Sequence, residues 1–149
     1  MSTQQNSVDE WSPQGPVTEL SGEQCWLRLD GSSFGRLGVS LDNQPEIFPV
    51  DYAADGTSIL FRTADGTKLR ELVANSSVVF EADAQTADSA WSVTVKGRAR
   101  VLDGIADIEL ADQQELPDWH PTRPFLYVRI VPSEIRGRQF KRGPLISEV

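Results

Sequence analysis

The stretch WSVTVKGRARVL, residues 91–102, carries the clearest strand signal in the chain. Apolar and polar side chains alternate along it, which is the period of a strand with one buried face. The inward set is Trp91, Val93, Val95, Ala99 and Val101, and the outward set is Ser92, Thr94, Lys96, Arg98 and Arg100. Gly97 stands at an inward position, where a long strand can bend at a barrel corner. The stretch therefore predicts a long strand that bends around a core.

Shorter strand signals lie on both sides of this stretch. They predict five further strands near residues 34–41, 46–52, 57–62, 77–82 and 125–135. Short helices are expected over 21–29, with Ser21 as N-cap and Gln24 at the capping-box position, over 67–74, and near 105–115. Six strands joined by short turns and two or three helices predict a mainly β chain folded as an antiparallel barrel.

Length and charge narrow the class of protein. A chain of 149 residues suits one domain, expected over 17–143 between a flexible tail at 1–16 and a short tail at 144–149. The net charge of −8 argues against nucleic acid or a membrane surface as the main partner. The single cysteine, Cys25, excludes an internal disulfide. Without a leader or an apolar span, the expected location is cytoplasmic.

The segment from Arg62 to Lys68 predicts an anion site. A strand ends at Arg62, a glycine turn follows, and a helix begins, so free backbone N–H groups meet two cations. Thr63 and Thr67 add hydroxyl donors, and a guanidinium can grip a phosphate through two hydrogen bonds. The alternative is an ordinary solvated turn. The glycine that precedes the lysine of a nucleotide P-loop is missing here.

A second candidate is the segment around Pro49. Proline lacks a backbone N–H, so the strand near Phe48, Pro49 and Val50 is expected at a sheet edge or interrupted there. Backbone groups beside it would then be free to bond a planar heteroaromatic ligand. The alternative is that the proline simply protects an edge.

Four motifs in order carry a family resemblance. They are Gly35-Arg36-Leu37, Pro45–Val50, Phe61-Arg62-Thr63 with Gly66–Leu69, and Trp91-Ser92-Val93 with Lys96–Ala99. From about Ser21 to Phe140 the chain resembles the pyridoxamine 5′-phosphate oxidase-like proteins, and most closely the small bacterial branch with nitroimidazole and deazaflavin-dependent reductases. No match is found to the C-terminal segment with which pyridoxamine phosphate oxidases bind their substrate.

The resemblance implies a Greek-key split β-barrel that binds FMN or, alternatively, the deazaflavin coenzyme. It implies a homodimer with two cofactor sites at the subunit interface and hydride transfer to or from a small conjugated substrate. Arg62, Thr63, Thr67 and Lys68 would hold the phosphate, and Phe48, Pro49 and Val50 would lie along the ring. The second subunit would add Trp91, Ser92 and Trp119. The alternative is a non-catalytic carrier or sensor of flavin or haem.

The remaining residues do not predict a catalytic or metal site. His120 is the single histidine, and the partners for metal or triad chemistry are missing, so no catalytic or metal-binding residue is predicted. Cys25 is expected in the core. The basic row of Lys96, Arg98 and Arg100 is interpreted as a solvated face, with dimer salt bridges as the alternative. Arg138 or Lys141 could reach the cofactor of the other subunit.

Overall fold

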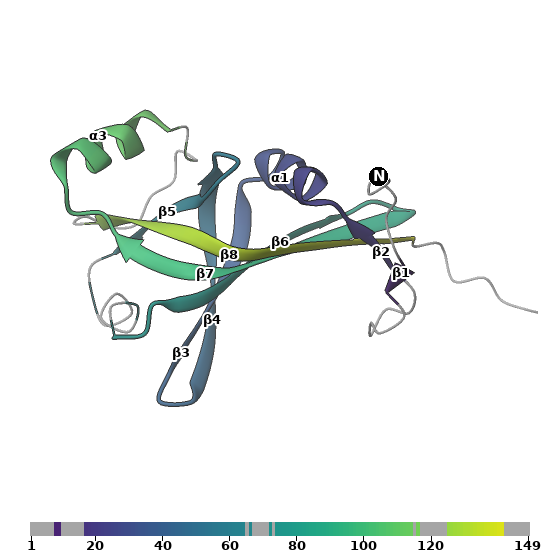
Figure 1. The fold of residues 1–149 in the computed structure, drawn as a ribbon, viewed down its shortest axis with the longest axis horizontal. Helices are drawn as coiled ribbons and strands as arrows, with labels where there is room; N and C mark the ends of the chain where they lie inside the picture. The colour runs from purple at the N-terminus through teal and green to yellow at the C-terminus, as the bar shows by residue number, and fades with distance from the viewer. Residues whose placement is uncertain are drawn as a thin grey trace, which may run out of the picture.

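The computed structural model of the chain describes residues 8–9, 17–64, 66, 72, 74–114, 116 and 125–141. Within these residues the protein is mainly β, with six long strands, two shorter ones and two helices (Figure 1). The elements are β1 (Val8–Asp9), β2 (Val17–Leu20), α1 (Gly22–Asp30), β3 (Phe34–Leu41), β4 (Gln44–Ala54), β5 (Ile59–Ala64), β6 (Ser77–Gln85), β7 (Ser89–Val101), α3 (Ile105–Gln113) and β8 (Phe125–Lys141).

The strands form one antiparallel sheet in the order β1-β2-β8-β5-β4-β3-β6-β7. β7 also pairs with β8, from Ser89 opposite Lys141 to Val101 opposite Val128, so the six long strands close into a ring. The ladder between β4 and β5 runs from Tyr52↔Phe61 to Ala54↔Ile59 and leaves the rest of both strands outside the pairing. This ring with a gap confirms the predicted split barrel.

Helix α1 begins at the capping box that its sequence predicts. The Ser21 side chain accepts a hydrogen bond from the Gln24 backbone N–H, and the Gln24 side chain accepts one from the Ser21 N–H. The same helix buries Cys25 and Leu29 against the barrel core. The Tyr52 hydroxyl donates to the Leu29 carbonyl oxygen at 2.8 Å, which ties the helix to β4. The predicted core position of Cys25 is confirmed, because its side chain is 1% exposed.

The bend predicted at Gly97 is confirmed. The register between β7 and β8 shifts between Lys96 and Gly97. A Cβ at Gly97 would lie 2.2 Å from the Val131 carbonyl oxygen, so no larger residue fits this crossing without moving the backbone. The glycine therefore lets β7 and β8 stay paired around the corner.

Several strands differ from the predicted bounds. β5 covers Ile59–Ala64 where a strand over 57–62 was predicted, so it continues past Arg62, and β6 extends to Gln85. β4 is continuous through Pro49, not interrupted there, because its ladder to β5 begins at Tyr52 and the missing N–H breaks no bond on that side. β8 continues to Lys141, well beyond the predicted end at residue 135, because it pairs with β7 and with β2. Arg138 and Lys141 therefore belong to β8.

Some predicted segments lie largely outside the described residues. Of the helix expected over 67–74, the structure describes Leu72 and Ala74, which are helical. Of the tail expected over 1–16, it describes Val8–Asp9, which pairs with β2. The acidic helix predicted near 105–115 is α3. In the described part of the chain, no helix is both long and apolar enough to cross a membrane.

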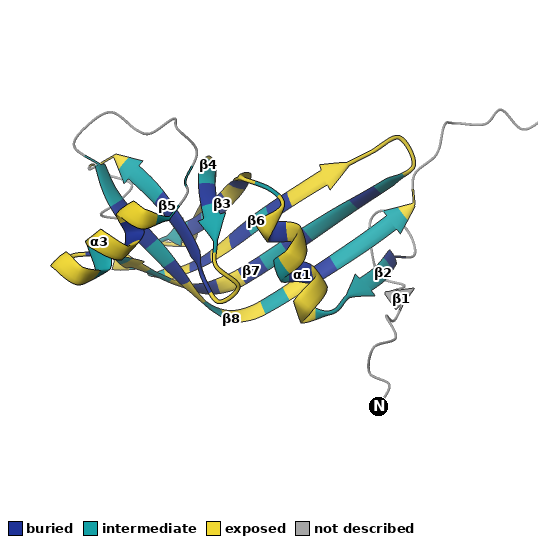
Figure 2. Ribbon diagram, turned by 90° about the horizontal axis from the view of Figure 1, so that it is seen from above, coloured by how far each residue is buried: buried dark blue, intermediate teal, exposed yellow. Residues whose placement is uncertain are grey.

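The barrel interior is the main core. Its largest fully buried side chains include Tyr52, Phe61 and Phe80, and the rings of Tyr52 and Phe80 meet edge to face at 4.8 Å. A second small cluster lies where α3 packs on the barrel and includes Leu60, Leu102, Ala111 and Tyr127. The Tyr127 hydroxyl donates to the Asp112 carboxylate at 2.5 Å and fastens α3. Figure 2 shows the dark buried bands inside the ring and the exposed outer side of α3.

Candidate functional site

A cavity of about 210 Å³ opens where β4 and β5 separate. Its position follows from the fold, because the ladder between these strands ends and their side chains and backbone groups are left facing a gap. It is lined by Leu37, Val39, Phe48, Pro49, Val50, Asp51, Phe61, Arg62, Thr63, Ala64 and Leu72. Most of this lining is apolar, and the charged groups are Arg62 and Asp51.

Five of the predicted cofactor residues meet in this cavity. Phe48, Pro49 and Val50 come from β4, and Arg62 and Thr63 come from the end of β5. Two segments that the sequence suggested independently are thus brought together across the gap. Their role as cofactor contacts stays a prediction.

The arginine at the end of β5 is held by its strand and by an aromatic ring. Arg62 is opposite Tyr127 in the ladder between β5 and β8. Its guanidinium carbon lies 5.7 Å from the centre of the Phe125 ring, within the range of a cation–π contact. The neighbouring Thr63 hydroxyl donates to the Ala64 carbonyl oxygen at 3.3 Å. Arg62 and Thr63 are neighbours in β5, so their side chains point to opposite faces of the strand. Arg62 lies on the face of Tyr127 and Phe125, and Thr63 lies on the face of Phe61.

The other predicted contacts are not in the cavity of the same chain. Thr67, Lys68 and Trp119 lie outside the described residues. Trp91 and Ser92 are on β7 and do not line the cavity. Trp91 packs against the barrel core, whereas the Ser92 hydroxyl donates to the Glu81 carboxylate at 3.1 Å on the outer side of the sheet. A role for these two residues in cofactor binding would require a second subunit.

Sequence reasoning missed the rest of the lining. Leu37, Val39 and Phe61 were not among the predicted cofactor contacts, and they are core residues that also line the cavity. Asp51 was not singled out. The periodicity of a strand predicts which face of the sheet a side chain lies on. It does not predict where the hydrogen-bonded ladder between two strands, here β4 and β5, comes to an end.

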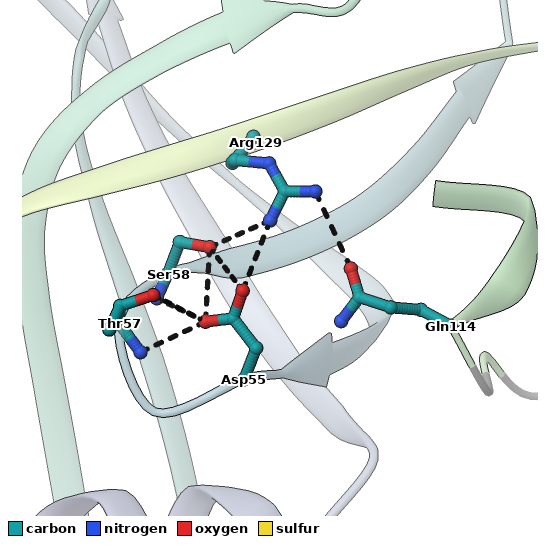
Figure 3. Close-up of polar contacts among 5 residues, drawn as sticks. All are labelled: Asp55, Thr57, Ser58, Gln114 and Arg129. Carbon is teal, nitrogen blue, oxygen red and sulfur yellow. Dashed lines mark hydrogen bonds and ion pairs between the residues drawn. The ribbon is translucent and has the colours of Figure 1, made fainter. Parts of the chain in front are cut away.

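A polar network fixes the turn that joins β4 to β5. The Asp55 carboxylate accepts hydrogen bonds from the backbone N–H groups of Thr57 and Ser58, at 2.9 and 2.7 Å, and from both hydroxyls. Arg129 of β8 donates to the Ser58 hydroxyl at 2.8 Å, forms an ion pair with Asp55 at 3.3 Å and reaches Gln114 (Figure 3). The sequence showed the Asp-Gly turn but not this network.

The network also sets the ionisation of Asp55. Partial burial acts to raise the pKa of this carboxyl, but the hydrogen bonds from Thr57 and Ser58 outweigh that effect and lower the pKa. The carboxylate therefore stays charged and keeps the hairpin fixed to β8. The turn joins the two strands that supply most of the cavity lining.

The fold and the cavity together define the class of protein: a split barrel with a mostly apolar cavity where the ladder between β4 and β5 ends. A model of the pyridoxamine 5′-phosphate oxidase family matches residues 21–139. This chain belongs to that family.

Similar proteins of known sequence or structure agree with this assignment. An uncharacterized Mycobacterium tuberculosis protein is 45% identical over 89 residues, which is 60% of this chain and 81% of its own. The FAD binding protein from Mycobacterium smegmatis is 38% identical with a TM-score of 0.72, covering 83% of this chain and 98% of its own. A FAD-binding protein from Mesorhizobium loti is 26% identical with a TM-score of 0.74, covering 83% and 96%.

Proposed function

We propose that this protein is a flavin-binding oxidoreductase whose cavity between β4 and β5 holds the cofactor. The observation that carries the proposal is the meeting of Phe48–Val50 with Arg62 and Thr63 in one cavity. The relatives described as FAD-binding proteins support a flavin as the ligand.

The residues of the cavity fit such a ligand. Phe48, Val50 and Phe61 offer an apolar surface for a planar ring, and the part of β4 beyond its ladder to β5 lines the same cavity. In this proposal the phosphate lies beside Arg62 and Thr63 in the last half of β5, and Thr67 and Lys68 follow closely in sequence. A bound flavin supplies hydride transfer at its ring. The chain itself binds the phosphate, orients the ring and keeps water from one side of it.

A second copy of the chain completes the site in this proposal. Pockets that enclose a drug-sized ligand usually measure about 300–1,000 Å³. The cavity of one chain measures about 210 Å³, which is too little to enclose a whole flavin nucleotide. A homodimer would cover the exposed part and bring Trp91, Ser92 and Trp119 of the other copy toward the ring.

Cofactor binding is tested with the purified protein. We expect a yellow protein whose released ligand is identified by mass as FMN, with the deazaflavin coenzyme and FAD as the alternatives. The Arg62→Ala variant is expected to bind that ligand about 10–100-fold more weakly, because a hydrogen bond to a charged group contributes about 1.5–3 kcal/mol. The matched control is Arg98→Ala, which removes an exposed arginine of β7. Equal affinity in both variants would show that the phosphate is held elsewhere.

Turnover separates an enzyme from a carrier. The loaded protein is mixed with NADPH, NADH or reduced deazaflavin and then with nitroaromatic or quinone acceptors, and the flavin absorbance is followed. We expect bleaching by one donor and recovery with an acceptor. A yellow protein that no donor reduces would contradict the enzyme proposal and favour a carrier or sensor of flavin. A Soret band in the absorption spectrum would identify haem as the ligand.

A further inference from the structure

The cavity between β4 and β5 contains a carboxylate to which the proposed function gives no role. Asp51 lines this cavity beside Val50 of the same strand, and its side chain is partly buried. Among the residues that the structure describes, none forms a hydrogen bond or an ion pair with this carboxylate. An ionised carboxylate only accepts hydrogen bonds, so the missing partner of Asp51 has to be a donor.

The strand register places Asp51 where the two strands begin to separate. The ladder between β4 and β5 ends at the pair Tyr52↔Phe61. Continued by one residue, the same register sets Asp51 opposite Arg62, so these two residues are the first on either side of the gap. Tyr52 and Phe61 belong to the barrel core, and side chains alternate along a strand, so Asp51 and Arg62 share the outer side of the barrel wall.

The other neighbours of Asp51 do not supply a donor. Across the ladder to β3 it is opposite Phe34, an apolar side chain. Arg36, two residues further along β3, forms ion pairs with two carboxylates of β6. The guanidinium of Arg62 carries five N–H donors and can serve several acceptors at once. A ligand that enters the gap therefore meets an acceptor, Asp51, on one strand and a donor, Arg62, on the other.

A ligand group that is both donor and acceptor suits this pair. A hydroxyl donates its proton to a carboxylate and accepts a hydrogen bond from a guanidinium. An ionised phosphate oxygen only accepts, and its negative charge is repelled by a carboxylate, so a phosphate suits Arg62 and Thr63 but not Asp51. In a flavin nucleotide the hydroxyls stand on the ribityl chain, which joins the ring to the phosphate.

We propose that Asp51 accepts hydrogen bonds from the ribityl hydroxyls of the bound cofactor and so selects flavins that carry this chain. The proposal rests on the flavin site of the proposed function. There the ring lies along Phe48–Val50 on β4 and the phosphate lies beside Arg62 and Thr63 on β5, so the ribityl chain crosses the gap between the strands. A planar ligand such as haem has no ribityl chain and offers Asp51 no hydroxyl.

Two flavins without a phosphate test the role of Asp51. Riboflavin carries the ribityl chain, lumiflavin carries a methyl group in its place, and neither makes the phosphate contact to Arg62. Both are titrated into the full chain after removal of bound cofactor, and the dissociation constants are measured by flavin fluorescence. We expect the wild type to bind riboflavin about 10–100-fold more tightly than lumiflavin, which is the effect of a hydrogen bond to a charged group. Asp51→Ala should lose this preference and keep the wild-type affinity for lumiflavin.

Two further variants separate ligand contact from a structural role. Asp51→Leu keeps the approximate size of the side chain without an acceptor and should give the same result as Asp51→Ala, so the test does not depend on one variant being folded. Asp103→Ala removes an exposed aspartate before α3 and should keep both wild-type dissociation constants. Equal losses for the two flavins in both Asp51 variants would overturn the proposal, because they would place Asp51 against the ring or in the frame of the cavity.

FMN binding by the same wild-type protein separates this proposal from the one on which it rests. A wild type that binds FMN but does not distinguish riboflavin from lumiflavin would refute the role of Asp51 and leave the flavin site standing. A wild type that binds neither riboflavin nor any of FMN, FAD and the deazaflavin coenzyme would refute the flavin site and the role of Asp51 together.

Discussion

The turn between β4 and β5 allows a quantitative prediction for Asp55→Ala. The carboxylate accepts hydrogen bonds from Thr57 and Ser58 and forms an ion pair with Arg129. Hydrogen bonds to a charged group contribute about 1.5–3 kcal/mol, and a buried group left without its partner costs a further 1–3 kcal/mol or so. The side chain of Asp55 is 36% exposed, so solvent screening reduces its share. We expect a loss of about 2–3 kcal/mol in the free energy of unfolding.

The assay is urea unfolding followed by tryptophan fluorescence. A lower midpoint with an unchanged slope is expected, because the change weakens the folded state without altering the surface exposed on unfolding. Asp55→Asn keeps one acceptor oxygen and loses the charge, so its loss should be smaller, about 1 kcal/mol. Asp103→Ala, an exposed aspartate before α3, is the control and should change stability by less than about 0.5 kcal/mol.

The difference in stability between these variants and the wild type should depend on pH. The pKa of Asp55 is lower in the folded protein than its ordinary value of 3.8. Its charge therefore stabilises the fold above about that pH, and the stabilisation is lost as the pH falls through the folded pKa. The stability gap between wild type and Asp55→Asn should be full at pH 6 and narrow below pH 4 or so. A gap that is absent at pH 6, or that widens on acidification, would refute this account of the turn.

Two further substitutions test the frame around the site. Gly97→Ala should lower the free energy of unfolding by about 1–3 kcal/mol, because the new Cβ meets the Val131 carbonyl oxygen; a midpoint equal to wild type in urea would contradict the corner. Tyr127→Phe removes the hydroxyl that donates to Asp112 and should lower the free energy of unfolding by about 1 kcal/mol. Amide hydrogen exchange should become faster in α3 and stay unchanged in β3. Equally faster exchange in both elements would contradict a local role for this hydrogen bond.

Short-range sequence patterns were enough to predict most of the helices and strands. Ser21 and Gln24 gave the start of α1, because a capping box depends on residues three positions apart. The alternation around Val93 and Val95 gave a strand and its buried face. Gly97 could be placed at a bend because a glycine at an inward position has no side chain to pack. Each of these features depends on neighbours that the sequence lists directly.

The ends of strands were harder to predict. Pro49 predicted a strand that is at a sheet edge or interrupted. β4 runs through Pro49 without interruption, and this part of it lies outside the ladder to β5, as the edge alternative predicts. Arg136 and Arg138 were expected beyond the last strand, yet β8 includes them because β2 and β7 pair with that part. Whether an extended segment has a partner depends on strands far away in sequence.

The sequence by itself predicted a mainly β barrel, an anion site in the segment from Arg62 to Lys68, and a strand marked by Pro49. The tertiary structure decided that residues of these two segments line one cavity, because the ladder between β4 and β5 ends at Tyr52 and Phe61. It also decided that Asp51 and Arg62 stand on either side of the gap where that ladder ends. Periodicity records the face of each side chain, whereas the pairing of distant strands fixes which faces and charges become neighbours.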